Sequence, residues 1–212
     1  MCRGELSKRD WKDDMSDSEK SLKVLLVVGN TASVSTTRVV VEATAALLRE
    51  KDCQVDLFDY ASEPLPLFNV ESSFQGEAYR DLKSRVTRAD VLVMGSPDYH
   101  GSMSGAAKNF LDHFWKEFGG KLFASIVGSY EKGLTVHDQI RTVARQCYAW
   151  SLPYGVSFHE KHDLEEGAQV TSTFQERLEM LAADVVAYGR VIAAQRLADL
   201  GGEGPGFMAH YR

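Results

Sequence analysis

The feature that most constrains the fold is a short apolar run, rich in β-branched residues, that occurs three times and is closed by a glycine each time. A run that is apolar at every position, not at alternate positions, is typical of a strand buried on both faces. Such strands occur in parallel sheets covered by helices on both sides. The three runs are residues 22–28, 91–94 and 122–127.

Helical periodicity fills the intervals between these runs. Apolar residues recur every three or four positions, which predicts amphipathic helices. Weaker strand patterns lie at residues 54–58 and 154–158. The alternation predicts an α/β protein with a flavodoxin-like, doubly wound, five-stranded parallel sheet and helices on both faces. The expected helices are residues 36–50, 74–88, 106–118, 136–147 and 174–197.

The chain of 212 residues divides into three expected parts. Residues 1–20 are polar and lack periodicity, which predicts a flexible N-terminal arm. Residues 21–200 form the expected domain, and the glycine-rich residues 201–212 a loose C-terminal tail.

Composition excludes several classes of protein. A net charge of −6 argues against a general nucleic-acid binder. The three cysteines are far apart and form no CxxC motif, so neither a structural zinc site nor a disulfide framework is expected. No secretory leader and no apolar run long enough to span a membrane is seen, so we expect a cytoplasmic protein.

The loop after the first strand carries many hydroxyl groups and no charge before Arg38. It lacks the glycine patterns of dinucleotide and nucleoside-triphosphate sites. Hydroxyls beside the unpaired N–H groups of a helix start can hold a terminal phosphate. A monophosphate such as that of FMN fits better than a triphosphate, which would need magnesium ligands. A polar loop with a Ser or Thr N-cap is the competing interpretation. The candidate phosphate ligands are Asn30, Thr31, Ser33, Ser35, Thr36 and Thr37.

The loop after the 91–94 strand carries the most specific motif. It reads Ser-Pro-x-Tyr-x-Gly-Ser over residues 96–102, and Lys-Asn-x-Leu-Asp follows over residues 108–112. This pattern resembles the NAD(P)H-dependent FMN reductases of the flavodoxin-like superfamily. The resemblance implies bound FMN, with NADPH or NADH as reductant, and an isoalloxazine pocket in this loop. A proline–glycine turn before a capped helix is the alternative. The implied pocket residues are Pro97, Asp98, Tyr99, His100, Gly101 and Ser102.

The resemblance also implies flavin contacts in a third loop, at Gly128, Ser129, Tyr130 and Gly133. The bulky residues 130–132 depart from the small residues usual in the family. The phosphate loop also lacks the arginine of the G-S-x-R pattern, and Arg38 is expected to be solvated. The choice between NADPH and NADH therefore stays open.

Hydride transfer at a flavin needs no protein base, so we expect no catalytic side chain. Tyr99 and His100 are the candidates for an auxiliary role beside the flavin. The nucleophile elbow of a hydrolase is absent, because Met103 stands where the serine would be. Residues 159–163 contain ligand-type side chains but are expected to form a solvated loop and no metal site.

The resulting hypothesis is an FMN-containing oxidoreductase that takes hydride from NAD(P)H. It would pass two electrons in a ping-pong cycle to a small-molecule acceptor: a flavin, a quinone, an azo compound or a metal oxyanion. A homodimer or tetramer is expected, from the family's use of the helix that carries Trp115. The alternatives are a non-enzymatic flavodoxin-type electron carrier and a regulatory module without flavin. The regulatory module would need an acidic pair in place of Gly29 and Asn30.

Overall fold

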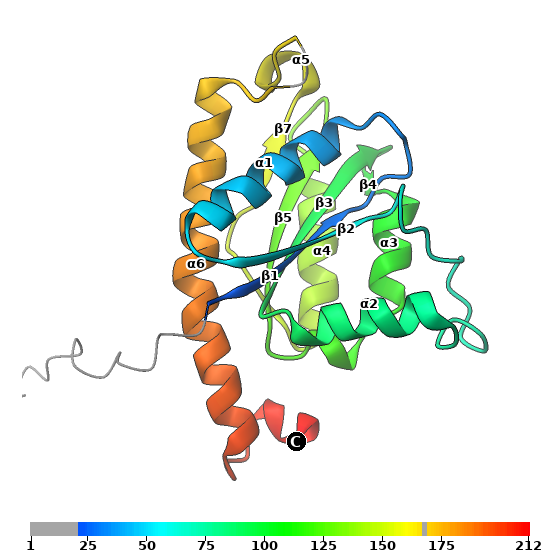
Figure 1. Ribbon diagram of the computed structural model, residues 1–212, viewed down its shortest axis with the longest axis vertical. Coiled ribbons are helices and arrows are strands. Elements are labelled where there is room, and N and C mark those ends of the chain that lie inside the picture. The colour runs from blue at the N-terminus through cyan, green and yellow to red at the C-terminus, as the bar shows by residue number, and fades with distance from the viewer. Residues whose placement is uncertain (1–20, 167–168) are drawn as a thin grey trace, which may run out of the picture.

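The computed structural model describes residues 21–166 and 169–212, and it contains a seven-stranded sheet. The order β2-β1-β3-β5 forms its centre, all parallel, and β6 and β7 both pair with the outer edge of β5 (Figure 1). This is the expected α/β, flavodoxin-like arrangement. The parallel strands are β1 (Lys23–Val28), β2 (Gln54–Asp59), β3 (Val91–Tyr99), β5 (Leu122–Gly128), β6 (Trp150–Ser151) and β7 (Val156–Phe158).

The strand count differs from the expected five for two reasons. The outermost strand is split into β6 and β7, because Pro153 has no N–H to donate to a ladder and lies between them. In addition, β4 (Ser102–Met103) folds back antiparallel on the end of β3, and β3 itself runs on to Tyr99 instead of ending near residue 94. Both additions lie at the carboxyl end of the sheet or at its edge.

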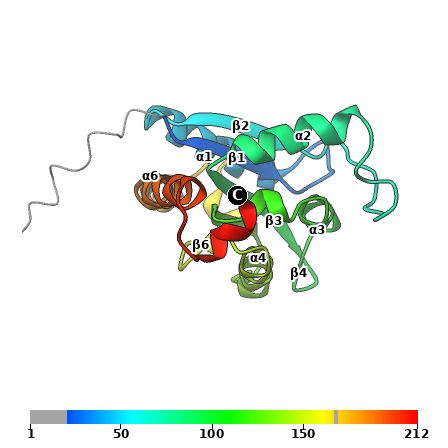
Figure 2. The same cartoon turned by 90° about the horizontal axis from the view of Figure 1, so that it is seen from below.

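Helices cover both faces of the sheet, in two separate apolar layers (Figure 2). On one face, α1 (Thr36–Glu50) and α6 (Ser172–Gly201) pack on residues such as Leu26 and Val93. On the other face, α2 (Glu77–Arg88), α3 (Gly105–Asp112) and α4 (Leu134–Gln146) pack on residues such as Leu25 and Leu92. Neighbouring strand residues thus face opposite layers, which explains runs that are apolar at every position.

The helix expected over residues 106–118 is shorter in the structure. It ends at Asp112, and the 3-10 helix η1 (Lys116–Phe118) follows. Phe114 and Phe118 are buried all the same, because the turn places their rings in the same aromatic cluster as Phe110. The periodic aromatic pattern predicted their burial correctly but not their secondary structure.

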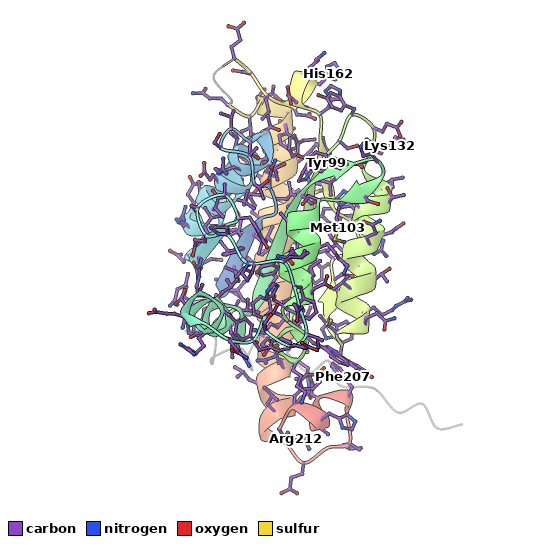
Figure 3. The ribbon with its side chains drawn as sticks, turned by 90° about the vertical axis from the view of Figure 1, so that its right-hand side faces the viewer. Tyr99, Met103, Lys132, His162, Phe207 and Arg212 are labelled. Carbon is purple, nitrogen blue, oxygen red and sulfur yellow. The ribbon has the colours of Figure 1, made fainter. Side chains whose placement is uncertain are left out.

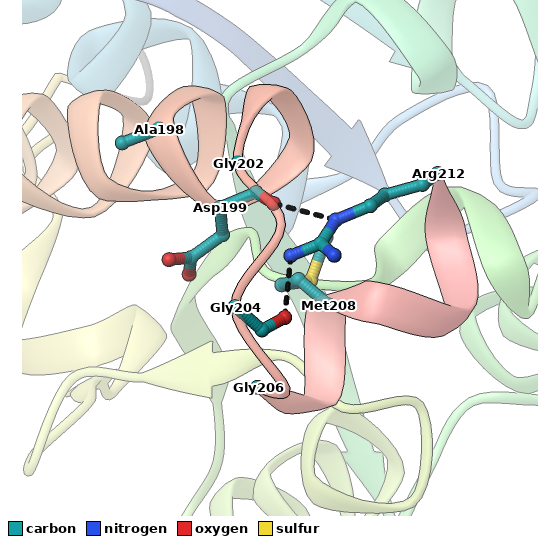
Figure 4. Close-up of a pocket in the computed structure, with 7 residues that line it drawn as sticks. All are labelled: Ala198, Asp199, Gly202, Gly204, Gly206, Met208 and Arg212. Atoms are coloured by element: carbon teal, nitrogen blue, oxygen red, sulfur yellow. Dashed lines mark hydrogen bonds between the residues drawn. The ribbon is translucent and has the colours of Figure 1, made fainter.

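The C-terminal residues are not the loose tail that the glycines suggested. They contain the 3-10 helix η2 (Phe207–Tyr211), and Met208 is buried. The Arg212 guanidinium donates hydrogen bonds to the carbonyl oxygens of Asp199 and Gly204, at 3.0 and 2.7 Å, and so closes the tail onto the end of α6 (Figure 4). The proposed arm, residues 1–20, lies outside the described residues. Along the described ranges, no helix is long and apolar enough to cross a membrane.

Candidate functional site

Three loops converge at the carboxyl end of the sheet, where β1, β3 and β5 lie side by side. The register pairs Val28 with Gly95, and Pro97 with Gly128, so the loops that follow these strands start at the same edge. Figure 3 shows Tyr99, Lys132 and His162 at this end of the molecule and Arg212 at the opposite end. The sequence-predicted site residues are therefore brought together by the topology.

Two side-chain hydrogen bonds tie these loops to one another. The Ser104 hydroxyl donates to the carbonyl of Gly29 and also accepts from Ala107 N, as the N-cap of α3. The Ser129 hydroxyl donates to Oδ2 of Asp98 at 2.9 Å. The first loop is thereby bonded to the second, and the second to the third.

In the first loop, Asn30 and Ser35 bond to the loop itself. Oγ of Ser35 caps α1 by accepting from Arg38 N at 3.2 Å, and it also accepts from Nδ2 of Asn30 at 3.0 Å. Thr37 is buried, with its methyl group directed toward Gly95. The N-cap interpretation is thus correct for Ser35. Thr31, Ser33 and Thr36 keep exposed or half-exposed hydroxyls.

Arg38 is not the solvated side chain that its position suggested. Its side chain is 16% exposed and forms an ion pair with Asp59 at the end of β2. The same guanidinium donates to the carbonyl oxygens of Ser33 and Ala32, at 2.8 and 3.0 Å. Burial opposes ionisation of Asp59, but hydrogen bonds from Arg38 and from the Ala61 N–H outweigh it and lower the pKa of the carboxyl group.

These arginine contacts orient the peptide groups of the first loop. In a trans peptide the N–H points opposite to the carbonyl. Because Ala32 and Ser33 turn their carbonyls toward the guanidinium, the N–H groups of Ser33 and Val34 point away from it. The result is a set of outward donors beside the start of α1, whose first turn holds no acidic residue.

The second loop is a tight hairpin between β3 and β4. His100 and Gly101 are its two central residues, with φ of 58° and 75°, which is the pattern of a type I′ turn. Oδ1 of Asp98 accepts from the Gly101 N–H at 2.8 Å. Pro97 is buried, whereas Tyr99, His100, Gly101 and Ser102 are exposed. The hairpin therefore presents an aromatic ring and backbone groups at the edge of the site.

The side-chain amide of Gln139 on α4 bonds to the β4 side of this hairpin. Its Oε1 accepts from the Met103 N–H at 2.8 Å, and its Nε2 donates to Oγ of Ser102 at 3.2 Å. Neither Gln139 nor Ser104 was among the residues selected from the sequence. Ser104 had a detectable signal, since a serine just before a helical pattern is an N-cap signature, but Gln139 had none.

The third loop mixes buried and exposed residues. Ser129 is buried; its N–H donates to the Phe158 carbonyl at 2.9 Å, and its Oγ accepts from Glu131 N at 3.1 Å. Gly133, with φ of 58°, begins α4. Tyr130 is 73% exposed and meets His159 edge to face. The third loop thus carries an exposed aromatic ring next to a backbone that is held by hydrogen bonds.

The segment after β7 is a short helix, α5 (Glu160–Asp163), not the loop that was expected. Nδ1 of His159 caps it by accepting from Lys161 N at 3.1 Å. The rings of His159 and His162 lie in contact, with centroids 4.4 Å apart and planes tilted by 35°. Within the described ranges, no group of three His, Cys, Asp or Glu side chains is arranged to hold a metal ion.

The residues present fit FMN. A phosphate monoester needs several N–H and O–H donors, and the first loop offers outward N–H groups, the start of α1 and three hydroxyls. The first turn of α1 holds no acidic residue, and the carboxylate of neighbouring Asp59 is paired with Arg38. A flat ring needs backbone groups that it can approach closely, and the hairpin at His100 and Gly101 supplies them beside Tyr99.

Comparison with known proteins agrees with this geometry. Residues 22–163 match the family model described as NADPH-dependent FMN reductase. The FMN-dependent NADPH-azoreductase of Staphylococcus saprophyticus is 26% identical over 179 residues, which cover 79% of this chain and 95% of that protein. The corresponding enzyme of Staphylococcus aureus is 24% identical over the same length and shares of the two chains.

Solved structures share the fold. FerB, a flavoenzyme NAD(P)H:(acceptor) oxidoreductase from Paracoccus denitrificans, has a TM-score of 0.65 at 18% identity, covering 82% of this chain and 98% of its own. The NADH:FMN oxidoreductase EMOB has a TM-score of 0.64 at 16% identity, covering 81% and 89%. With the family match spanning more than half of the sequence, the chain belongs to the NADPH-dependent FMN reductase family and is an FMN oxidoreductase that uses NAD(P)H.

Proposed function

We propose that the three loops at the carboxyl end of the sheet form the FMN site of this oxidoreductase. The phosphate lies at the first loop, held by the N–H groups and hydroxyls of residues 30–37. The ring lies against the second and third loops. The observation that carries this assignment is the donor-rich start of α1, where the first turn holds no acidic residue and Asp59 is paired with Arg38. It lies at the same edge of the sheet as the hairpin that carries the exposed Tyr99. The ring contacts are Pro97, Asp98, Tyr99, His100, Gly101, Ser102, Gly128, Ser129, Tyr130 and Gly133.

Bound FMN supplies the redox chemistry: it accepts hydride from NAD(P)H and returns two electrons to the acceptor. The protein binds and orients. Arg38 and Asp59 hold the phosphate loop, while Asp98 and Gln139 hold the hairpin. Tyr99 and His100 are exposed on that hairpin and act as auxiliaries that contact whichever substrate occupies the site. Since one site serves both substrates in turn, the kinetics are ping-pong.

The acceptor is a small molecule of the flavin, quinone, azo or metal-oxyanion class. An open rim supports this range, because Tyr99 and Tyr130 are both more than half exposed. The azoreductase names of the Staphylococcus relatives place azo compounds among the first acceptors to test. A cytoplasmic location is part of the proposal.

The chain also forms a homodimer or tetramer. Trp115 is 64% exposed beside α3, and Met180 and Val191 are 51% and 67% exposed on the outer side of α6. Apolar side chains of this size, exposed on two separate elements, support contact with further copies. Light scattering of the purified chain measures the mass directly, and a monomer at all concentrations contradicts this part.

Flavin titration and anaerobic mixing test the redox part. The purified chain should bind FMN, and NADPH or NADH should then bleach its visible absorption without accumulation of a one-electron state. A chain that binds FMN but is bleached by neither nucleotide is a flavodoxin-type carrier. A chain that binds no FMN refutes the site. Turnover with quinone, azo dye, free flavin and metal oxyanion then ranks the acceptors.

A further inference from the structure

A buried histidine under the third loop has no part in the site described so far. His137 lies in the first turns of α4 and is 7% exposed. Both ring nitrogens are bonded: Nδ1 lies 2.7 Å from Oγ of Ser125 on β5, and Nε2 lies 2.9 Å from Oγ of Ser157 on β7. The Ser157 hydroxyl in turn donates to the carbonyl of Lys132, in the third loop.

The last of these bonds fixes the direction of the others. A hydroxyl has a single hydrogen, and that of Ser157 is donated to Lys132. Ser157 must therefore accept from Nε2–H of His137. In the neutral ring, which burial favours by lowering the pKa of His137, Nδ1 is then the acceptor for the hydroxyl of Ser125. A neutral ring protonated at Nε2 thus links the floor of the sheet to a loop carbonyl through three consecutive hydrogen bonds.

The surrounding backbone is built around this ring. A Cβ atom on Gly155 would lie 2.2 Å from Nδ1 of His137 and 2.5 Å from Oγ of Ser125, so only glycine leaves the space that the pair occupies. Burial lowers the pKa of His137, consistent with a neutral ring; Asp138 opposes this shift and Arg141 adds to it. The partners from β5 and β7 are uncharged serines, and the loop contributes a carbonyl.

We propose that His137 is a positioning residue for the flavin: through Ser157 it holds the Lys132 carbonyl, and with it the third loop, at the position in which Ser129 and Gly133 meet the bound ring. The proposal rests on the FMN site proposed above. Besides this link, Ser129 is bonded to Asp98 and Phe158 at the other end of the loop, and its Oγ accepts from Glu131 N. Loss of the histidine link removes the bond that orients the Ser157 hydroxyl toward the Lys132 carbonyl, and so loosens the loop at Lys132.

A pair of amide variants and a pair of alanine variants together separate positioning from packing. The amide nitrogen of glutamine reaches about as far as Nε2 of histidine, whereas the asparagine amide reaches only about as far as Nδ1. His137→Gln can therefore still donate to Ser157, while His137→Asn can bond only toward Ser125. Both replace the ring by a smaller neutral amide, but the asparagine side chain is one methylene shorter, so packing alone also predicts a difference between them. Ser157→Ala and Ser125→Ala each remove a single hydroxyl group, so this second pair compares the two bonds at equal change in volume.

The experiment titrates each full-length variant with FMN and follows flavin fluorescence and the visible spectrum. His137→Gln should bind within about threefold of the unmodified chain. His137→Asn and Ser157→Ala should bind about tenfold more weakly, the effect of about one hydrogen bond, with a changed absorption spectrum of bound flavin. Ser125→Ala, which removes only the bond on the sheet side, should keep both affinity and spectrum.

The result is decisive in each direction. Equal affinities for the Gln and Asn variants, whether tight or weak, overturn the positioning role, as does a Ser157→Ala chain that binds like the unmodified one. Because Ser157 is at the edge of the sheet, that variant remains informative if a histidine variant does not fold. Failure of the unmodified chain to bind FMN instead refutes the site itself.

Discussion

Replacement of Arg38 by methionine tests whether the first loop is a phosphate site oriented from behind. The change keeps an unbranched apolar stem but removes the donors to the carbonyls of Ala32 and Ser33 and the ion pair with Asp59. The peptide groups of the loop then lose the contacts that turn their N–H groups outward. FMN must order the loop as it binds, and this cost lowers its affinity.

The magnitude follows from the two carbonyl contacts. Both have normal lengths, 2.8 and 3.0 Å, and both are partly open to water, so each contributes about 1 kcal/mol net. A loss of about 2 kcal/mol corresponds to about a thirtyfold rise in the Kd for FMN. Arg49→Met, in the exposed last turn of the same helix, is the matched control and should leave the Kd unchanged within about twofold.

The assay compares FMN with riboflavin, which has the same ring and no phosphate. If the loop holds the phosphate, Arg38→Met weakens FMN binding and leaves riboflavin binding unchanged. An Arg38→Met/Asp59→Asn chain should bind FMN no more weakly than the single variant, since the two residues act as one unit. Equal losses for FMN and riboflavin would refute the reasoning, because they would place the effect at the ring or in the fold.

Three further outcomes are expected. Lys121→Met removes the buried amine group that donates to three carbonyls at the end of α2, so urea unfolding should show a free energy of unfolding lower by about 3 kcal/mol. The control Lys108→Met, at an exposed position, should lower it by less than about 0.5 kcal/mol, and equal losses would contradict this. Because burial lowers the pKa of His137, the unfolded chain gains its proton first as pH falls; the free energy of unfolding should therefore decrease below about pH 6.5, and less steeply in His137→Gln. Identical pH slopes would contradict the neutral ring. Asn109→Ala removes the hydrogen bonds to Phe68 N and the Pro66 carbonyl, at 2.7 and 2.9 Å, so limited proteolysis should cut between residues 61 and 75 faster. An unchanged cleavage rate would show that these two bonds do not hold the loop.

The strands, and the edge of the sheet at which the three candidate loops meet, could be predicted because burial on both faces leaves a local trace in the sequence. Each central strand is a continuous apolar run, and parallel strands bring their following loops to one edge. The split between β6 and β7 left a weaker trace in Pro153. The two-residue strand β4 left almost none, because its hairpin uses His100 and Gly101, where asparagine and glycine would be the usual signal.

What escaped prediction depends on partners that are distant in sequence. Arg38 reads as solvated one turn into a helix, and only the placement of β2 beside β1 brings Asp59, 21 positions later, within reach. Gln139 meets Met103 across 36 positions because α4 lies against β4. Motif matching selects residues that a cofactor touches. It does not select those that hold the touching residues, since these are fixed by the packing of one family member.

The polar groups that hold the site also explain how an anionic cofactor suits a chain with a net charge of −6. The guanidinium nearest the phosphate loop is already neutralised by Asp59, so it contributes orientation more than net charge. The attraction for phosphate then comes from N–H dipoles that are fixed before binding. Binding to N–H dipoles that are already fixed costs less conformational entropy than binding to mobile lysine side chains, which must be ordered. Electrostatic attraction that rests on local dipoles falls off quickly with distance, so FMN binding should depend only weakly on ionic strength compared with binding by a lysine-rich site.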